Sequence, residues 1–335
     1  GWPRTPEMTS AKGLRLVERD AGGVDLAFRE DVLAGLAEAQ KAVPARWFYD
    51  DRGSQLFEDI TQLPEYYPTR AETEILQTRA GSIADLVGEA RAVVEFGSGS
   101  SVKTPLLLSA IRPSAYVPLD IAGDFLRASS AALAAKFPGL PVYPVEADFM
   151  RRVELPAEVA GLPKLGFFPG STIGNMIART ATDLLRTMRA TLGEGAMLLI
   201  GMDLVKDEEI LLAAYDDAAG VTAQFNLNLL KRINRELGGD IPIDAFAHEA
   251  RWNDAFARIE MHLVAQSDVA FTVGGQRFAM RAGESIHTEN SHKFTKRSAQ
   301  MLLAAAGWEP CARWTDEARQ FSLVLAESRP PRSAP

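Results

Sequence analysis

A short apolar run that ends in an acid and a pair of glycines constrains this chain more than any other stretch. Residues 93–96 contain Glu95 and lead into Gly97-Ser98-Gly99, and residues 102–111 then have a helical pattern. A buried parallel strand that feeds a glycine turn and a helix gives this order, and the glycines let the backbone pass close to a ligand. The first turn of the next helix offers unpaired N–H groups and a positive dipole end. A nucleoside site is one explanation, and a simple turn after a strand is the other.

The residues around the glycines distinguish two kinds of nucleoside cofactor. Val102 stands where the dinucleotide pattern G-x-G-x-x-G needs its third glycine. Glu95 lies just before the first glycine, and an acid there suits a cationic head such as the amino group of S-adenosylmethionine. The first hypothesis is therefore a methyltransferase, and a nicotinamide-dependent oxidoreductase is its rival.

Composition and charge exclude other classes. The chain has 335 residues, 47% of them hydrophobic, which is enough for one large or two modest domains. Its formal net charge is -8 without a basic block, so neither nucleic acid nor an anionic membrane is an expected partner. The single cysteine, Cys311, cannot form an internal disulfide, and no apolar run approaches the ~20 residues of a membrane span. Without a signal-peptide pattern or heptads, we expect a cytoplasmic monomer.

Strands and helices alternate from residue 92 onward. Five strands are expected at residues 93–96, 115–121, 142–147, 164–168 and 196–202, with helices at 103–111, 123–137 and 180–192. Repeated βα units of this length predict a doubly wound parallel sheet, in which ligands bind at the carboxyl ends of the strands. The alternation stops after Asp203 and resumes with a helix at 292–306 and strands at 308–315 and 321–327.

The stretch between these parts is too long for a loop and predicts a second lobe. Its expected elements are a mostly helical segment at 207–237, strands at 258–265, 270–273 and 277–281, a Gly274-Gly275 hairpin turn and a loop at 283–290. Before the sheet we expect a helix at 28–42, an irregular segment at 63–70 because of its two prolines, and a helix at 71–81 capped by Thr69. The expected division is a sheet domain of residues 70–203 and 293–330, a substrate-binding lobe of residues 17–69 and 204–292, and loose termini at 1–16 and 331–335.

Acids at the ends of three successive strands are candidate cofactor ligands. Asp120 lies about 20 residues past the glycine turn, where Rossmann folds place the acid that binds ribose hydroxyls. Asp148 can accept a hydrogen bond from an adenine amino group, and the Phe149 ring can stack on the base. Helix caps and a core aromatic explain the same residues, but Glu95 makes a third acid in this pattern. Lys103 either contacts the carboxylate of the cofactor or faces solvent.

Polar residues in two further segments are candidates for substrate binding. The apolar, glycine-rich loop at 168–175 ends in Asn175, whose amide can donate to a carboxylate or can cap the next helix. Glu289 and Ser291 are two residues apart, so in an extended segment both side chains point the same way. A solvated carboxylate is the alternative for Glu289. No metal is predicted, because no metal-ligand spacing joins the four histidines, His248, His262, His287 and His292.

Six segments of the sequence resemble the histidine Nα-methyltransferases of ergothioneine biosynthesis. They are residues 46–50, 64–70, 95–101, 168–175, 215–218 and 288–291, within a resemblance that covers residues 28–327. The resemblance implies an α/β fold, with a Rossmann-like class I methyltransferase domain and a second α+β lobe formed by the N-terminal segment and an insertion after the fifth strand. It implies three methyl transfers from S-adenosylmethionine to the α-amine of L-histidine, which give hercynine and S-adenosylhomocysteine in the first step of ergothioneine biosynthesis. A methyltransferase for another amine and a non-catalytic binding protein remain alternatives.

The resemblance also implies which residues form the site. The residues that match the substrate site of the family are Tyr66, Gly170, Asn175, Tyr215, Met261, Glu289 and Ser291. The residues that match its cofactor site are Tyr49, Glu95, Gly97, Ser98, Lys103, Asp120, Asp148 and Phe149. Asn175 and Tyr215 are expected to hold the substrate carboxylate, and Glu289 with Ser291 the imidazole, near Met261. The expected places of Gly170, Tyr49 and Tyr66 are around the amine, and the two tyrosines are the catalytic candidates.

Overall fold

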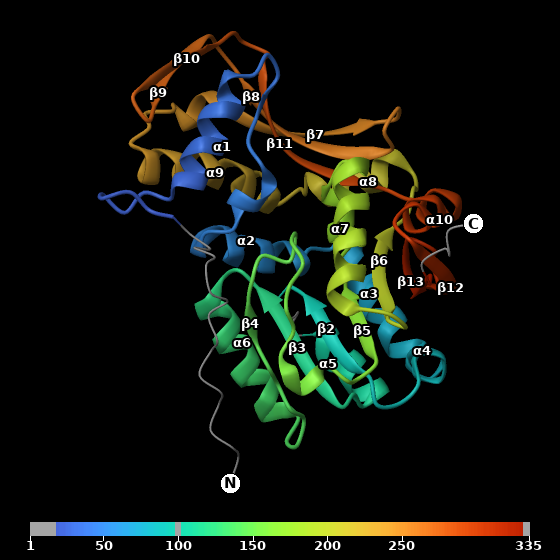
Figure 1. Cartoon of the computed structure of the whole chain (residues 1–335). Coiled ribbons are helices and arrows are strands. Elements are labelled where there is room, and N and C mark those ends of the chain that lie inside the picture. Colours follow the sequence, from blue (N-terminus) through green and yellow to red (C-terminus); the bar gives the residue numbers. More distant parts are fainter. Residues whose placement is uncertain (1–17, 98–101, 331–335) are drawn as a thin grey trace, which may run out of the picture.

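A seven-stranded sheet runs through the lower half of the molecule in Figure 1, which is a computed structural model that describes residues 18–97 and 102–330. The strand order is β12-β13-β6-β5-β2-β3-β4. The strands are β2 (Ala92–Phe96), β3 (Ala115–Asp120), β4 (Val145–Glu146), β5 (Lys164–Phe168), β6 (Met197–Asp203), β12 (Trp308–Thr315) and β13 (Phe321–Ser328). Strands β2 to β6 are parallel, whereas β13 is antiparallel to both of its neighbours. The carboxyl ends of five parallel strands therefore meet at one edge of the sheet.

Helices cover both faces of this sheet. They are α3 (Tyr67–Thr78), α4 (Ala80–Val87), α5 (Lys103–Ile111), α6 (Gly123–Lys136), α7 (Ala178–Leu192) and α10 (Lys296–Ala305). Side chains of successive residues in a strand point to opposite faces, so Val94 packs in one core with α7 and α10 while Val93 packs in another with α3, α4 and α5. The predicted doubly wound α/β sheet is confirmed.

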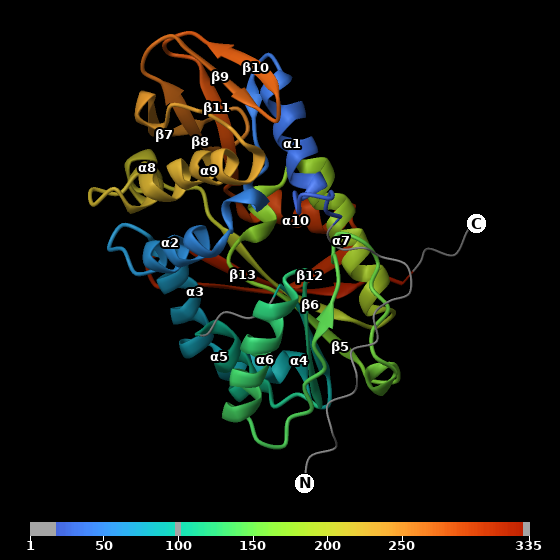
Figure 2. The same ribbon diagram turned by 90° about the vertical axis from the view of Figure 1, so that its left-hand side faces the viewer.

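A four-stranded sheet with its own helices lies above the first in both views (Figures 1 and 2). Its order is β1-β11-β8-β7, made of β1 (Lys41–Ala42), β11 (Ser285–His292), β8 (Arg258–Ala265) and β7 (Phe246–Asn253). The strands β9 (Val269–Val273) and β10 (Gln276–Met280) form a separate hairpin, as the paired glycines predict. The remaining helices are α1 (Leu26–Ala37), α2 (Asp51–Thr61), α8 (Glu208–Tyr215) and α9 (Val221–Leu237), with short 3-10 turns η1 (Ala45–Phe48), η2 (Ala157–Val159), η3 (Thr172–Asn175) and η4 (Ile243–Ala245).

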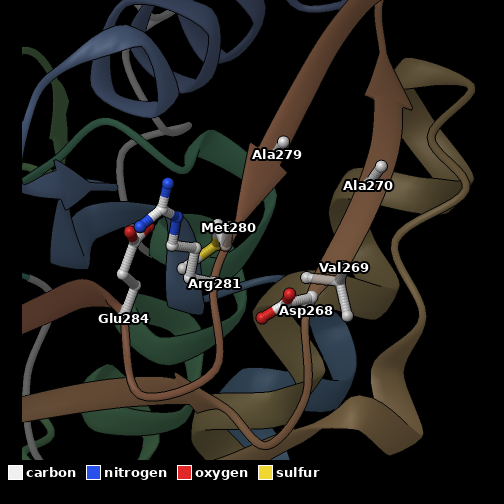
Figure 3. Close-up of a pocket in the computed structure, with 7 residues that line it drawn as sticks. All are labelled: Asp268, Val269, Ala270, Ala279, Met280, Arg281 and Glu284. Atoms are coloured by element: carbon white, nitrogen blue, oxygen red, sulfur yellow. The ribbon is translucent and has the colours of Figure 1, made fainter.

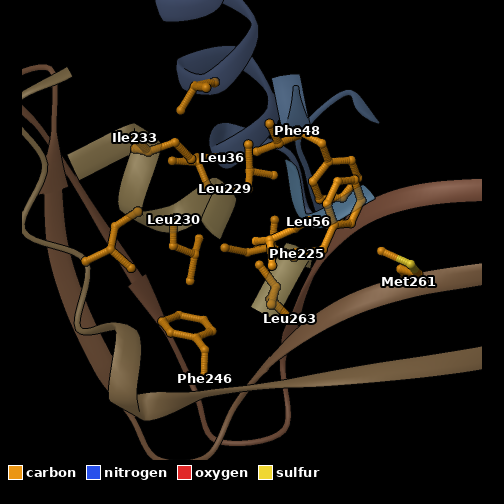
Figure 4. Close-up of a cluster of buried hydrophobic side chains, with 14 of the residues drawn as sticks. Leu36, Phe48, Leu56, Phe225, Leu229, Leu230, Ile233, Phe246, Met261 and Leu263 are labelled. Atoms are coloured by element: carbon orange, nitrogen blue, oxygen red, sulfur yellow. The ribbon is translucent and has the colours of Figure 1, made fainter. Parts of the chain in front are cut away.

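One apolar cluster joins these helices to the four-stranded sheet (Figure 4). It draws its buried residues from 28–67 and 211–286, two stretches that are far apart in the sequence. The rings of Phe48 and Phe225 stack at a centroid distance of 4.5 Å and connect η1 to α9. Because neither stretch contains this core alone, the N-terminal segment and the insertion are held together by apolar burial.

Two expected elements of this region were wrong. Residues 285–290 of the expected loop at 283–290 belong to strand β11, and the helix expected to reach residue 42 ends at Ala37 and gives way to β1. Both errors come from strand pairing, because β11 pairs with β8 along its length and Lys41 and Ala42 pair in parallel with Ile286 and His287. Backbone pairing between segments so distant in sequence leaves no periodic signal in either of them.

The two prolines did not keep residues 63–70 irregular throughout. Helix α3 already begins at Tyr67 and has Pro68 in its first turn, where the missing N–H of proline removes no helical hydrogen bond. Thr69 is therefore inside the helix and does not cap it, since the N-cap position belongs to Tyr66. The single helix expected at 71–81 is replaced by α3 and α4. In the described part of the chain, no helix is long and apolar enough to cross a membrane.

Candidate active site

The glycine turn at the end of β2 leaves open space beside the backbone. Gly97 has a φ of +111°, a conformation that side chains disfavour, and its N–H donates to the carbonyl of Leu119 at 2.9 Å. Among the described residues, apart from its chain neighbours, no atom lies within 4 Å of the position that a Cβ would take. A ligand can therefore approach the chain here at the carboxyl edge of the sheet. Ser98 lies outside the described residues.

Glu95 lies in the core beneath this turn. Its side chain is buried, and Oε1 accepts hydrogen bonds from Thr104 Oγ1 and Tyr116 Oη, both at 2.8 Å. Burial raises the pKa of Glu95 to about 7, although the two hydrogen bonds and the nearby Lys103 ammonium act in the opposite direction. Glu95 thus connects β2 to α5 and β3 through these hydrogen bonds. Its direct contact with a cofactor stays a prediction.

Replacing Glu95 by glutamine is expected to change the stability of the protein relative to the wild type in a pH-dependent way. The glutamine variant should compare more favourably with the wild type at about pH 8 than at about pH 4. A folded-state pKa of about 7 against the ordinary value of 4.5 means that the wild type loses stability as the pH rises between these values. The uncharged amide does not titrate and can still accept the two hydrogen bonds. The difference in unfolding free energy between the variant and the wild type should therefore change by on the order of 3 kcal/mol from about pH 4 to about pH 8. A difference between the two proteins that stays constant over this range would contradict the raised pKa.

Local hydrogen bonds hold the two other acids at the strand ends. Asp120 Oδ1 accepts from the N–H of Ala122 at 2.9 Å, and Asp148 Oδ1 accepts from the N–H of Met150 at 3.0 Å. Both are turn contacts to the residue two positions on and not helix caps, since the N-cap position of α6 belongs to Ala122 and has no side-chain cap, and they fix each carboxylate at the edge of the sheet. The half-buried ring of Phe149 packs edge-to-face against Phe168 with a centroid distance of 6.0 Å. All three residues are at the edge where Gly97 leaves open space.

Lys103 does not face solvent. It is 7% exposed and its Nζ lies 2.7 Å from Glu72 Oε1, which also accepts from the N–H of Gly170 at 2.8 Å. A Cβ at Gly201 would come within 2.2 Å of Glu72 Oε2, so glycine is required for this buried carboxylate to fit. Glu72 therefore links Lys103 to the Gly170 loop. Nothing in the sequence pattern singled out Glu72, because its two partners lie about 30 and 100 residues further along the chain.

The loop that follows β5 docks on strand β11. The carbonyl of Gly174 accepts from His292 Nδ1 at 2.7 Å, and a Cβ at Gly174 would meet the His292 carbonyl at 2.7 Å. Asn175 ends η3, and its side chain has no hydrogen bond to another residue in the described ranges. It does not cap α7, because the N-cap position belongs to Ile177, which lies two residues further on. The Asn175 amide is thus available to a ligand.

A buried polar cluster holds two of the expected substrate ligands. The Tyr215 hydroxyl and Ser291 Oγ are 2.9 Å apart, and Lys293 Nζ donates to both, at 2.8 Å and 2.9 Å. Lys293 Nζ also pairs with Asp203 Oδ2 at 2.7 Å. Burial alone would raise the pKa of Asp203, but the charges of Lys293 and Lys206 hold it below its usual range. Sequence reasoning named Tyr215 and Ser291 but missed the lysine that positions them, whose only signal was its place next to their motif.

Glu289 is the least satisfied acid of this region. Its half-buried carboxylate has no hydrogen bond to another side chain among the described residues, and burial raises its pKa to about 7 against the attraction of Lys293. Strand β11 has a bulge between His287 and Glu289, and Glu289 pairs with Met261 of β8. The bulge therefore directs Glu289 to the same face as Met261 and Ser291. A half-buried carboxylate without a partner in the described residues is an expected feature of a site for a cationic or N–H-donating group.

Aromatic rings line the approach to this carboxylate. The ring of Tyr66 contacts that of Tyr215 at a centroid distance of 6.1 Å, and Phe57 lies between Tyr66 and Tyr49 at 6.4 Å and 5.8 Å. Burial, with the nearby Tyr215 and Glu289, raises the pKa of Tyr66 well above its ordinary value. The phenol of Tyr66 therefore stays protonated, whereas Tyr49 is 42% exposed at the outer end of this row.

A shallow pocket on the β9–β10 hairpin is separate from these residues (Figure 3). Its lining residues are Asp268, Val269, Ala270, Ala279, Met280, Arg281 and Glu284. None of the expected site residues lines it, so this pocket does not add to the candidate active site.

The sheet order and the open edge beside Gly97 define the class of protein. Numbered within the seven-stranded sheet, the first five strands follow the order 3-2-1-4-5 of Rossmann folds, and β13 is inserted antiparallel beyond them. This is the fold of class I S-adenosylmethionine-dependent methyltransferases. The chain belongs to the family of SAM-dependent, histidine-specific methyltransferases, whose family model matches residues 28–328.

Relatives from bacteria and a fungus support this assignment. The chain is 45% identical over 314 residues to a histidine N-alpha-methyltransferase of Mycobacterium tuberculosis (strain CDC 1551 / Oshkosh), which covers 92% of this chain and 96% of that protein. It is 44% identical over 306 residues to the protein of the same name in Mycolicibacterium smegmatis, over 90% of this chain and 94% of that protein. It is also 29% identical over 304 residues to ergothioneine biosynthesis protein 1 of Neurospora crassa, over 87% of this chain and 34% of that protein.

Proposed function

We propose that this enzyme transfers three methyl groups from S-adenosylmethionine to the α-amine of L-histidine, giving hercynine in the first step of ergothioneine biosynthesis. The half-buried, unpartnered carboxylate of Glu289 is the observation that carries the choice of substrate. An imidazole N–H can satisfy this carboxylate, and Ser291 Oγ, two residues along the same face, can hold the other ring nitrogen. The names of the mycobacterial and fungal relatives agree with this substrate and pathway.

The other end of the substrate meets different groups. In the proposal, the free amide of Asn175 and the hydroxyl of Tyr215 donate to the substrate carboxylate. Lys293 donates to that hydroxyl at 2.8 Å, which fixes its position and places a positive charge near the carboxylate. The carbonyl of Gly170 accepts from the α-amine, with the two tyrosines beside it. Each of the three polar groups of histidine then has a separate set of partners.

The cofactor edge fits a nucleoside with a cationic head. The residues proposed to hold it are Tyr49, Glu95, Gly97, Ser98, Lys103, Asp120, Asp148 and Phe149. Gly97 gives space for close approach, and the fixed carboxylates of Asp120 and Asp148 can accept from ribose and adenine, as in other Rossmann folds. Bound there, S-adenosylmethionine would supply an electrophilic methyl carbon on its sulfonium.

Positioning is the main contribution that these residues make to the reaction. An in-line displacement needs a deprotonated and aimed amine, and orientation can lower the barrier by on the order of 7–11 kcal/mol. Because its pKa is raised well above the ordinary value, Tyr66 acts through its hydroxyl as a hydrogen-bonding group and does not become a phenolate base. In the proposal, Tyr66 and Tyr49 orient the amine, and the proton leaves to solvent on the exposed side of Tyr49. No metal takes part in this transfer.

In the proposal, a substrate-binding lobe and a methyltransferase domain together form this active site. The separate apolar core shared by residues 28–67 and 211–286 supports a substrate-binding lobe of residues 17–69 and 204–292 beside a methyltransferase domain of residues 70–203 and 293–330. We propose further that the enzyme is a cytoplasmic monomer with no nucleic-acid or membrane partner. Light scattering after gel filtration tests the monomer.

Incubation with S-adenosylmethionine and a mixture of amino acids, read by mass spectrometry, tests the reaction. Addition of three methyl groups to histidine alone is the expected result. Methylation of another amine would move the assignment to a different substrate, and no transfer at all would favour a binding protein. A change in the absorbance of a reduced nicotinamide, which the sequence left as the rival class, would overturn the proposal.

A further inference from the structure

Three potential metal ligands meet on the face of the four-stranded sheet that is opposite Glu289. His262 of β8 pairs with His287 of β11, so their side chains share one face, and Glu260 lies two residues before His262 on that face. Their ligand atoms all lie within 4.8 Å of one another. The carboxylate Oε1 of Glu260 is 2.9 Å from His262 Nε2 and 4.0 Å from His287 Nε2. Sequence spacing could not show this group, because it forms across two strands.

Neighbouring side chains hold two of these ligands in orientation. Glu260 Oε2 accepts from Asn253 Nδ2 and Arg258 Nε, both at 2.9 Å, which leaves Oε1 directed toward the two histidines. His262 Nδ1 is 2.8 Å from Ser285 Oγ, and Nε2 donates to Glu260 Oε1 at 2.9 Å, so an ion at Nε2 would take the place of this proton while Ser285 holds the other ring nitrogen. Partners of this kind around a metal ligand fix its tautomer and orientation.

We infer that Glu260, His262 and His287 form a binding site for a divalent transition-metal ion, with Zn²⁺ as its first candidate. Two imidazoles and one carboxylate are a common set of zinc ligands, with bonds of about 2.0–2.2 Å. Ligand atoms around a tetrahedral zinc are then about 3.3 Å apart. This distance lies between the 2.9 Å and the 4.0 Å that separate Glu260 Oε1 from the Nε2 atoms of His262 and His287. The side chains of His287 and Glu260 are 17% and 12% exposed, so an ion can reach the cluster.

The site would act on the other face of the sheet through the bulge. His287 immediately precedes the bulge that turns Glu289 toward Met261, and His287 Nε2 donates to the carbonyl of Glu289 at 3.0 Å, a hydrogen bond that an ion on Nε2 would replace. A metal bound to His287 and to both β8 side chains would cross-link the two strands at this point. The ion is therefore a structural clamp behind the substrate pocket, and its effect on histidine binding rests on the proposed function.

Calorimetric titration of the full, tag-free and chelator-treated chain with Zn²⁺ tests the site. We expect one ion per chain, and Co²⁺ should give the visible absorption of a four-coordinate complex. His287→Ala, at a partly exposed position, should weaken Zn²⁺ binding at least tenfold. His248→Gln is the matched control, because His248 pairs with Leu263 and so lies on the opposite face of the sheet. It removes one of the four histidines of the chain but should keep full affinity.

The outcomes distinguish this site from the proposed reaction. Zinc binding that is absent, or equal in the wild type and in His287→Ala, would overturn the metal site, and circular dichroism confirms that the variants are folded. Glu260→Gln gives a second variant, which keeps the hydrogen-bonding side chain but should also lose at least tenfold in affinity. Because the titration contains neither histidine nor S-adenosylmethionine, its result does not depend on the methyl transfer.

Discussion

Replacing Lys293 by methionine is expected to lower the free energy of unfolding by about 3 kcal/mol. The ammonium group is fully buried 2.7 Å from Asp203 Oδ2, and methionine fills the space but leaves that carboxylate short of a partner. Lys206 still pairs with Oδ1 at 2.9 Å, which places the loss at the lower end of the range for breaking a buried ion pair. Urea unfolding of the two proteins at neutral pH measures the difference.

Matched variants separate the ion pair from the simple loss of a lysine. Lys296→Met removes an exposed lysine three residues further on and should change stability by less than about 0.5 kcal/mol. Adding Asp203→Asn to Lys293→Met should recover part of the loss, because no charge is then left without its partner. Acid should also reduce the loss, since a protonated Asp203 needs no counter-charge. Equal stabilities of the Lys293 and Lys296 variants would show that this pair does not support the fold.

Replacing Glu289 by alanine is expected to weaken histidine binding at least tenfold and to leave the affinity for S-adenosylmethionine unchanged. A charge-assisted hydrogen bond to the imidazole contributes roughly 1.5–3 kcal/mol, which corresponds to a factor of ten or more. The bulge in β11 holds this carboxylate on the face of Met261, and Glu289 belongs to the proposed substrate site and not to the proposed cofactor site. Calorimetric titration with each ligand in turn gives both affinities.

Two further variants sharpen this test. Glu289→Gln keeps an acceptor oxygen without the charge and should fall between the wild type and the alanine variant. Glu284→Ala removes an exposed acid just before the same strand and should bind histidine as the wild type does. An unaltered histidine affinity in Glu289→Ala would remove Glu289 from the substrate site, even if the enzyme still methylates histidine.

The parallel sheet was predictable because each of its elements carries its own signal. The apolar runs that become β2 and β5 lead into Gly97 or a Pro-Gly pair, and α7 between β5 and β6 has a clear 3.6-residue period. In the other sheet, the two-residue strand β1 forms by pairing with β11, β11 pairs along its length with β8, and β7 lies on β8 at the edge. Such polar, half-buried strands lack the alternation that would identify them, so the expected loop at 283–290 was wrong.

The candidate site also has a part that the sequence predicts and a part that only the structure shows. Asn175, Tyr215 and Ser291 belong to motifs that can be found in the sequence, and the structure adds what holds them. Lys293 joins the hydroxyls of Tyr215 and Ser291 to Asp203, a residue about 90 positions earlier. Sequence spacing contains no information on such a contact, because it depends on how the end of β6 meets the end of β11.

The sequence by itself determined that a strand ending at Gly97 and a helix at residues 103–111 would form, and it predicted a nucleoside cofactor between them. Those features are local, because the conformational freedom of Gly97 and the burial of an apolar strand are properties of neighbouring residues. Only the tertiary structure decided which face Glu289 occupies, since one bulge reverses the direction of every later side chain in β11. The same strand pairing brought Glu260, His262 and His287 together behind it.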